Sequence, residues 1–200
     1  MSTITGNYYD KYNSRNPLAR LLTGGFLRSF DALVGRMPAA GQAYEIGCGE
    51  GNLAIRLAKM GFQVTASDIT DEILEVASRR AGEEQARISF EKKSVYELRD
   101  LRGKALIVCC EVLEHLEDPR EALRIIADAK PGYALLSVPR EPLWRVLNVL
   151  RLKYLSALGN TPGHVQHWSG AGFLRLLSER FRILEIRKPL PWTMVLAQPR

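Results

Sequence analysis

Three glycines at every second position, Gly47, Gly49 and Gly51, restrict what this chain can fold into more than any other feature. Residues 43–46 precede them with the apolar character of a buried strand, and residues 52–58 follow with apolar side chains on one face of a helix. Glycine accepts positive φ and has no Cβ, so the backbone of such a turn can approach a ligand while the helix N-terminus presents free N–H groups. The sequence therefore predicts a strand, a turn and a helix that bind a nucleotide-like ligand.

The spacing of this turn excludes two common phosphate-binding patterns. Dinucleotide sites use G-x-G-x-x-G and P-loops use G-x-x-x-x-G-K-[ST], whereas residues 45–51 read E-x-G-x-G-x-G. A second predicted strand, residues 62–68, ends in Asp68, 17 positions after Gly51. Its carboxylate is suited to accept both hydroxyl protons of a ribose. The alternative is that Asp68 caps a helix beginning near Asp71.

Two motifs resemble those of a known family. Residues 45–51 resemble the first motif of the class I S-adenosylmethionine-dependent methyltransferases, and residues 111–116, Glu-Val-Leu-Glu-His-Leu, resemble the motif that follows their fourth strand. With Asp68 the resemblance extends over residues 43–138. Within this family, the chain is similar to the ubiquinone-biosynthesis O-methyltransferases. The resemblance implies S-adenosylmethionine as cofactor, with contacts from Glu45, Gly47, Cys48, Gly49, Gly51, Asp68, Ile69, Ser94, Val95 and Glu111. Ser94 stands where the family often has Asp, and the alternative role for Ser94 is to cap a helix over residues 95–101.

Strands alternate with helices along most of the chain. The strands expected after the first two are residues 86–91, 105–110, 133–138, 181–187 and 192–197. Helices are expected at residues 119–130 and from a cap at Ser169, and the last two strands follow each other directly. This order predicts an α/β fold with a doubly wound, seven-stranded, mostly parallel, Rossmann-like sheet and one antiparallel edge strand.

We expect residues 1–200 to form a single domain with two additions. A helix is expected from Pro17, with a bend or an interruption at Gly24–Gly25. In the resembling family a segment like residues 1–40 lies over the cofactor as a lid, and the alternative is that this helix packs on the sheet edge. Residues 140–168 form an insertion that we expect to cap the substrate. Its helix, residues 142–155, has a broad apolar face and a stripe at Arg145, Asn148 and Arg151. Such a helix can cover an apolar substrate, lie on a membrane or pack on the domain.

Polar residues after the fourth strand predict the chemistry. If residues 111–115 form a helical turn, Glu111, Glu114 and His115 share one face and can bind a divalent cation such as Mg²⁺, Mn²⁺ or Zn²⁺. Similar sets are metal ligands in ubiquinone-biosynthesis O-methyltransferases and in methyltransferases of small-RNA 3′ ends. The other two histidines, His164 and His167, lie in the insertion. The alternative to a metal is that His115, His164 or His167 acts as a base, with Glu111 near the amino group of the cofactor.

These features favour methyl transfer to a small, apolar or lipid-linked acceptor. A base or metal beside the acceptor favours O-methylation, because a hydroxyl must lose its proton. The net charge of +6 and pI near 9.4 suit an anionic partner, either RNA or a membrane surface touched peripherally. An RNA methyltransferase is the alternative, although no RNA-binding motif is present, and a non-catalytic cofactor-binding module is a third. Three cysteines without metal spacing, no signal peptide and no apolar run of about 20 residues predict a cytoplasmic protein.

Overall fold

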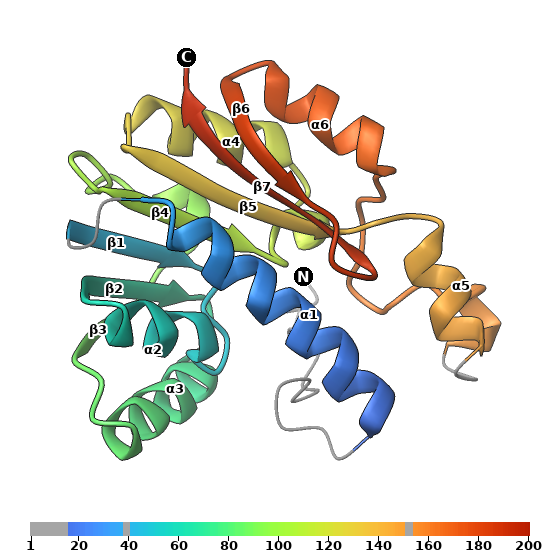
Figure 1. The fold of residues 1–200 in the computed structure, drawn as a ribbon, viewed down its shortest axis with the longest axis horizontal. Helices are drawn as coiled ribbons and strands as arrows, with labels where there is room; N and C mark the ends of the chain where they lie inside the picture. The colour runs from blue at the N-terminus through green and yellow to red at the C-terminus, as the bar shows by residue number, and fades with distance from the viewer. Residues whose placement is uncertain (1–15, 38–40, 151–153) are drawn as a thin grey trace.

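The computed structural model describes residues 16–37, 41–150 and 154–200 and has the predicted α/β architecture. Within these residues seven strands form one sheet, in the order β3-β2-β1-β4-β5-β7-β6 (Figure 1). Neighbouring strands pair in parallel except at β7, which is antiparallel to both β5 and β6 and therefore lies one place in from the edge. The strands are β1 (Gly41–Ile46), β2 (Phe62–Asp68), β3 (Ile88–Lys92), β4 (Leu106–Cys110), β5 (Tyr133–Pro139), β6 (Phe181–Arg187) and β7 (Trp192–Pro199).

Helices cover both faces of the sheet. The first three helices pack on one face, α4 and α6 pack on the other, and α5 projects beyond both layers (Figure 1). The α-helices are α1 (Pro17–Val34), α2 (Asn52–Lys59), α3 (Asp71–Glu83), α4 (Pro119–Asp128), α5 (Leu143–Leu150) and α6 (Gly170–Ser178). Three short 3-10 turns complete the described chain: η1 (Val95–Glu97), η2 (Leu113–His115) and η3 (Leu155–Ala157).

Two apolar clusters hold the helices to the sheet. Phe26 and Leu57 belong to the cluster under α1 and α2, and Leu123 and Phe173 belong to the cluster under α4 and α6. Strand β4 is buried along its whole length, as its continuous apolar sequence predicts for a central strand covered on both faces. Its cysteines, with Cys48, are buried free thiols. The sheet is therefore a rigid base for the loops at its carboxyl edge.

Helix α1 is continuous, so the predicted interruption at Gly24–Gly25 is wrong. Phe26 and Phe30 are almost completely buried against the sheet face, while Leu18 and Leu21 near the start of the helix are exposed. Burial of the aromatic face outweighs the weak helix propensity of two glycines. The C-terminal half of α1, with Phe26 and Phe30, packs on the sheet as the alternative predicts. Residues 1–15 of the predicted lid lie outside the described residues.

Candidate active site

The glycine turn joins β1 to α2 with a closed side and an open side. Gly47, Gly49 and Gly51 have φ of 68°, 52° and 79°. A Cβ at Gly47 would lie 2.4 Å from Val112 Cγ2, and one at Gly51 would lie 3.2 Å from the Cβ of Ala77. A Cβ at Gly49 would meet nothing within 4 Å. The backbone is therefore packed on both flanks and leaves space at Gly49, where a ligand could lie against it.

Asp68 closes β2 beside this open position. Its Oδ2 accepts the N–H of Gly49 at 2.9 Å, and its Oδ1 accepts the N–H of Ile69 at 2.7 Å. The residue that precedes α3 as its N-cap is Thr70, so the interpretation of Asp68 as a helix cap is wrong. Each carboxylate oxygen keeps a further lone pair for a hydroxyl donor. The side chain of Ile69 is 50% exposed and offers an apolar surface next to it.

Glu45 is a buried carboxyl group on β1, under the turn. Burial raises the pKa of Glu45 well above its ordinary value, the negative charge of Asp68 raises it further, and a backbone hydrogen bond at Ala54 lowers it. No described residue forms a hydrogen bond with Glu45 Oε2. Burial also raises the pKa of the neighbouring Cys48 thiol, with help from the charges of Glu45 and Asp68. The Cys48 thiol is therefore neutral and unsuited to act as a nucleophile, and its predicted contact with the cofactor stays a prediction.

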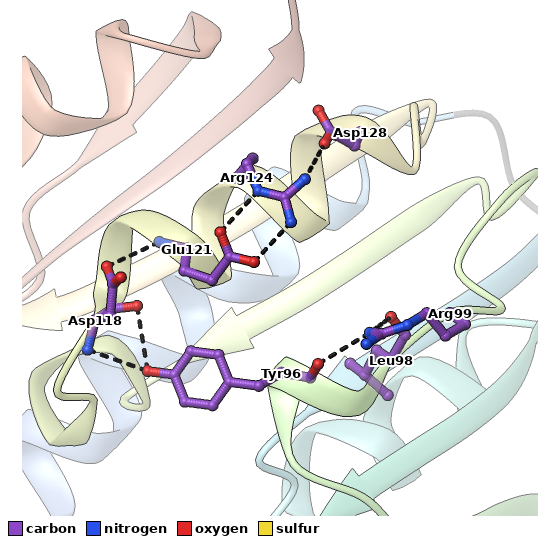
Figure 2. A network of polar contacts seen from close by, with 7 residues as sticks. All are labelled: Tyr96, Leu98, Arg99, Asp118, Glu121, Arg124 and Asp128. Atoms are coloured by element: carbon purple, nitrogen blue, oxygen red, sulfur yellow. Dashed lines mark hydrogen bonds and ion pairs between the residues drawn. The ribbon is translucent and has the colours of Figure 1, made fainter.

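Ser94 is an N-cap, as the alternative interpretation predicts, but it caps the 3-10 turn η1 and not a helix over residues 95–101. Its Oγ accepts the N–H of Tyr96 at 3.4 Å, and its own N–H donates to Glu97 Oε2 at 2.8 Å. The Tyr96 hydroxyl donates to the carbonyl of Asp118 and accepts its N–H, both at 3.2 Å (Figure 2). The Asp118 carboxylate in turn caps α4 through the N–H of Glu121. This network ties the loop after β3 to the loop after β4, and an adenine contact at Ser94 or Val95 stays a prediction.

Glu111 does not share a helical face with Glu114 and His115, so that prediction is wrong. The helical turn begins only at Leu113, and Glu111 has φ of 60°, outside the right-handed helical region. Its Oε2 accepts the indole N–H of Trp192 at 2.5 Å, and its Oε1 accepts the Ser137 hydroxyl at 3.4 Å. Glu111 therefore faces β5 and β7.

Three other side chains form a compact polar cluster at the end of β4. Glu114, His115 and His164 each offer a ligand atom, and these atoms lie within 4.8 Å of one another. The two imidazole rings meet edge to face, with centroids 4.8 Å apart. His115 Nδ1 lies 3.0 Å from the carbonyl oxygen of Gly163. Because a carbonyl only accepts hydrogen bonds, this contact assigns a proton to Nδ1, so in the neutral ring Nε2 is unprotonated.

His164 is one of the three candidate histidines of the sequence, and the structure brings it together with Glu114 and His115. The signal present in the sequence was the concentration of all three histidines in two segments. His167, which was predicted beside it, forms a 2.7 Å contact between its Nε2 and Asn160 Oδ1 and is not one of the three clustered residues.

The insertion presents its apolar side outward. Asn148 on α5 is only 4% exposed and donates to the Gly159 carbonyl at 2.9 Å. Arg145 Nε donates to the Leu158 carbonyl at 3.2 Å, so the predicted polar stripe faces the insertion's own loop, and Arg151 lies outside the described residues. The exposed face of α5 is instead apolar and consists of Val146, Val149 and Leu150. None of the described helices is long and apolar enough to cross a bilayer.

Comparisons with known proteins agree with this geometry. A family model described as a methyltransferase domain matches residues 43–131. The ubiquinone biosynthesis O-methyltransferase of Xanthomonas axonopodis is 32% identical over 126 residues, which cover 60% of this chain and 53% of the relative. The chain thus spans about half the length of the curated relatives that it matches.

Solved structures of methyltransferases share the fold. Magnesium protoporphyrin IX methyltransferase from Synechocystis, solved with S-adenosylhomocysteine bound, superposes with a TM-score of 0.72 at 21% identity, covering 95% of this chain and 91% of that one. The N-methyltransferase NodS from Bradyrhizobium japonicum, also solved with S-adenosylhomocysteine, gives a TM-score of 0.68 at 18% identity, covering 97% and 93%. Residues 43–131 thus match a methyltransferase domain, and the chain has the fold of solved S-adenosylmethionine-dependent methyltransferases.

Proposed function

We propose that this chain transfers a methyl group from S-adenosylmethionine to a hydroxyl oxygen of a small acceptor with apolar character. The observation that carries the proposal is a juxtaposition at one sheet edge. An open glycine turn with Asp68 beside it lies at the ends of β1 and β2, and the cluster of Glu114, His115 and His164 follows the adjacent β4. Ligands of parallel α/β sheets bind at this edge.

The residues of the turn fit the cofactor. The space at Gly49 leaves room for the cofactor to lie against the protein backbone. The Asp68 carboxylate has lone pairs for ribose hydroxyls, and Ile69 offers apolar surface to an adenine. The unused oxygen of Glu45 is suited to a donor from the amino-acid end. When bound, S-adenosylmethionine supplies a methyl group that is already activated on a positively charged sulfur. The work left to the protein is to orient the acceptor, exclude water and remove a proton.

The cluster of Glu114, His115 and His164 is our proposed proton acceptor or metal site. His115 Nε2 is unprotonated in the neutral form assigned by its contact with Gly163, which suits either role. If a cation binds, one carboxylate and two imidazoles would hold it, a set that suits Zn²⁺ or Mn²⁺ better than Mg²⁺. Bound metal would lower the pKa of an acceptor hydroxyl, and without metal the imidazole would take its proton directly.

Calorimetry with S-adenosylhomocysteine and NAD tests the cofactor first. We expect binding of S-adenosylhomocysteine and none of NAD, and tight NAD binding would contradict the proposal. Transfer of a radiolabelled methyl group to a panel of phenols, catechols and prenylated phenols then tests the reaction. The matched variants are His115→Ala, His164→Ala and His167→Ala, the last as a control because His167 is not in the cluster. We expect the first two to slow transfer and the third to leave it unchanged.

A chelator separates the two roles of the cluster. Loss of transfer in chelator with recovery in Zn²⁺ or Mn²⁺ supports a metal site, whose affinity falls at low pH as the histidines are protonated. Transfer that survives chelator but loses the acidic limb of its pH profile in His115→Ala supports a base. If neither substitution nor chelator changes the rate, the cluster has no part in the chemistry.

We also propose that the outward face of α5 receives the apolar part of the acceptor at an anionic membrane surface. Val146, Val149 and Leu150 are exposed there, and residues 142–178 contain no acidic side chain. Co-sedimentation with vesicles containing phosphatidylglycerol measures the contact. The double substitution of Val149 and Leu150 by Ser should reduce binding and leave S-adenosylhomocysteine affinity unchanged. Leu184→Ser on β6 is the matched control, since Leu184 is also exposed. Equal binding by all three proteins would refute the contact.

A further inference from the structure

The insertion has two sides, and its inner side holds His164. On α5, Trp144 and Asn148 are four residues apart and therefore lie on one face. That face meets residues 159–164 of the following loop, and Trp144 also meets Trp192 at the start of β7, with ring centroids 5.7 Å apart. The loop continues onto η2, where the N–H groups of Val165 and Gln166 both donate to the Glu114 carbonyl, at 2.9 and 3.0 Å. The helix, the loop and the turn are thus linked in series.

Thr161 is the residue at which the links converge. Its side-chain oxygen accepts two hydrogen bonds, from Trp144 Nε1 at 2.8 Å and from Asn148 Nδ2 at 3.2 Å. Its backbone carbonyl accepts the N–H of His164 at 3.0 Å. Thr161 is 3% exposed and Asn148 is 4% exposed, so these bonds are shielded from water. Losing the shared acceptor would leave the half-buried indole N–H of Trp144 without the Thr161 hydroxyl, which is costly.

His164 stacks on the Trp144 indole, the same ring that donates to the Thr161 hydroxyl. The rings of Trp144 and His164 are close to parallel, at 23°, with centroids 5.8 Å apart. His164 also meets the His115 ring, at 85° with centroids 4.8 Å apart. The imidazole of His164 therefore contacts both an indole held by Thr161 and the histidine of η2, and its own backbone is held by the same Thr161.

We propose that Thr161 is a positioning residue: it sets the orientation of the His164 imidazole in the polar cluster by fixing the Trp144 indole and the His164 backbone together. The significance for catalysis rests on the proposed function, because Thr161 is not itself in the polar cluster and acts only through Trp144 and His164. The orientation of His164 is a property of the folded chain alone, so it can be measured without cofactor, metal or acceptor.

Histidine ring signals in proton NMR test the proposal on the full chain. There are three histidines, and single His→Ala variants assign their signals. Thr161→Val keeps the shape of the side chain and removes the acceptor. We expect the His164 signal to lose the ring-current shift from Trp144 and to move toward the value of free histidine, with His167 unchanged. Thr161→Ser restores the acceptor and should return His164 to its wild-type position.

Thr193→Val is the matched control. Its hydroxyl is fully buried on β7 and has no hydrogen-bond partner among the described residues, so the same chemical change there removes no bond. An unchanged His164 signal in Thr161→Val, or a Thr161→Ser variant as altered as Thr161→Val, would overturn the proposal.

A second variant covers the case in which Thr161→Val does not fold. Trp144→Phe removes the indole donor and keeps an aromatic ring in a half-buried position. We expect faster amide hydrogen exchange in residues 159–167 than in wild type, whereas Thr193→Val should match wild type. Wild-type exchange in Trp144→Phe would overturn the proposal. Failure of methyl transfer in a protein with a correctly placed His164 signal would count against the proposed function alone.

Discussion

Replacing Gly49 by Ala separates the role of this residue in binding from its role in folding. Gly49 has φ of 52°, and an added Cβ would meet nothing within 4 Å. The cost to stability is therefore only that of placing an L-residue in the left-handed region, about 1–2 kcal/mol. The added methyl group instead occupies the space in which we propose that the cofactor lies. A tenfold loss of affinity corresponds to about 1.4 kcal/mol, and we expect at least this for S-adenosylhomocysteine.

Two other glycines supply the comparisons. Gly103 also has positive φ, 74°, and open space around a Cβ, but it lies in the loop before β4, at the opposite end of that strand from the polar cluster. Gly103→Ala should lose the same 1–2 kcal/mol and bind normally. At Gly47 the new Cβ would lie 2.4 Å from Val112 Cγ2, so overpacking of about 1–3 kcal/mol adds to the backbone cost. Gly47→Ala should therefore lose about 2–5 kcal/mol in all.

Urea unfolding and calorimetry on the three variants test this reasoning. The expected pattern is that Gly49→Ala and Gly103→Ala share one unfolding free energy and differ in ligand affinity. Normal affinity in Gly49→Ala would refute the placement of the ligand at the open side of the turn. A loss of stability in Gly49→Ala as large as that in Gly47→Ala would refute the steric argument.

Two further predictions concern buried polar groups. Because the pKa of Glu45 is raised in the folded state, the native protein holds this proton above the pH at which the unfolded chain releases it, so its stabilising effect is lost as pH rises from the ordinary value of 4.5 toward the folded pKa. Glu45→Gln cannot ionise, so its unfolding free energy relative to wild type should increase with pH between 4 and 8 in urea titrations; a constant difference would contradict the raised pKa. Trp192→Phe removes the indole donor to Glu111 Oε2, and the bond to a charged group is worth about 1.5–3 kcal/mol. Its loss of stability should exceed that of Ser137→Ala, whose hydroxyl donates to Glu111 at the longer distance of 3.4 Å; the reverse order would refute the assignment.

Local signals in the sequence were sufficient to predict the strands of the sheet and the glycine turn at its carboxyl edge. The bounds of β2, Phe62–Asp68, follow directly from its apolar alternation and terminal carboxylate, and the glycine turn falls where the spacing of Gly47, Gly49 and Gly51 predicts. In each case the features that decide the structure lie within a few residues of one another. Backbone conformation and burial pattern are then encoded in the same short segment.

The conformation of Glu111 depended on residues far along the chain. Spacing alone placed it on a helical face with Glu114, whereas its carboxylate is bound by Trp192, 81 residues later. Similarly, periodicity identified two sides of α5 and could not decide which side faces outward. The decision comes from Thr161 and Gly159, which give Asn148 its partners. A polar residue turns inward when a loop offers it hydrogen bonds, and no local pattern contains that information.

The two sides of α5 also separate two tasks that a single helix must perform at this sheet edge. Its inner residues Trp144 and Asn148 hold Thr161 and, through it, His164, so substitutions there change the polar cluster. Its outer residues Val146 and Val149 make no part of that network and are exposed to whatever approaches. Under the proposed function, the preference for an acceptor can therefore change through the outer face while the histidine geometry is conserved by the inner face. We expect exchange of Val146 and Val149 for larger apolar residues to alter which acceptors are methylated and to leave the His164 NMR signal in place. A displaced signal would mean that the two faces are coupled.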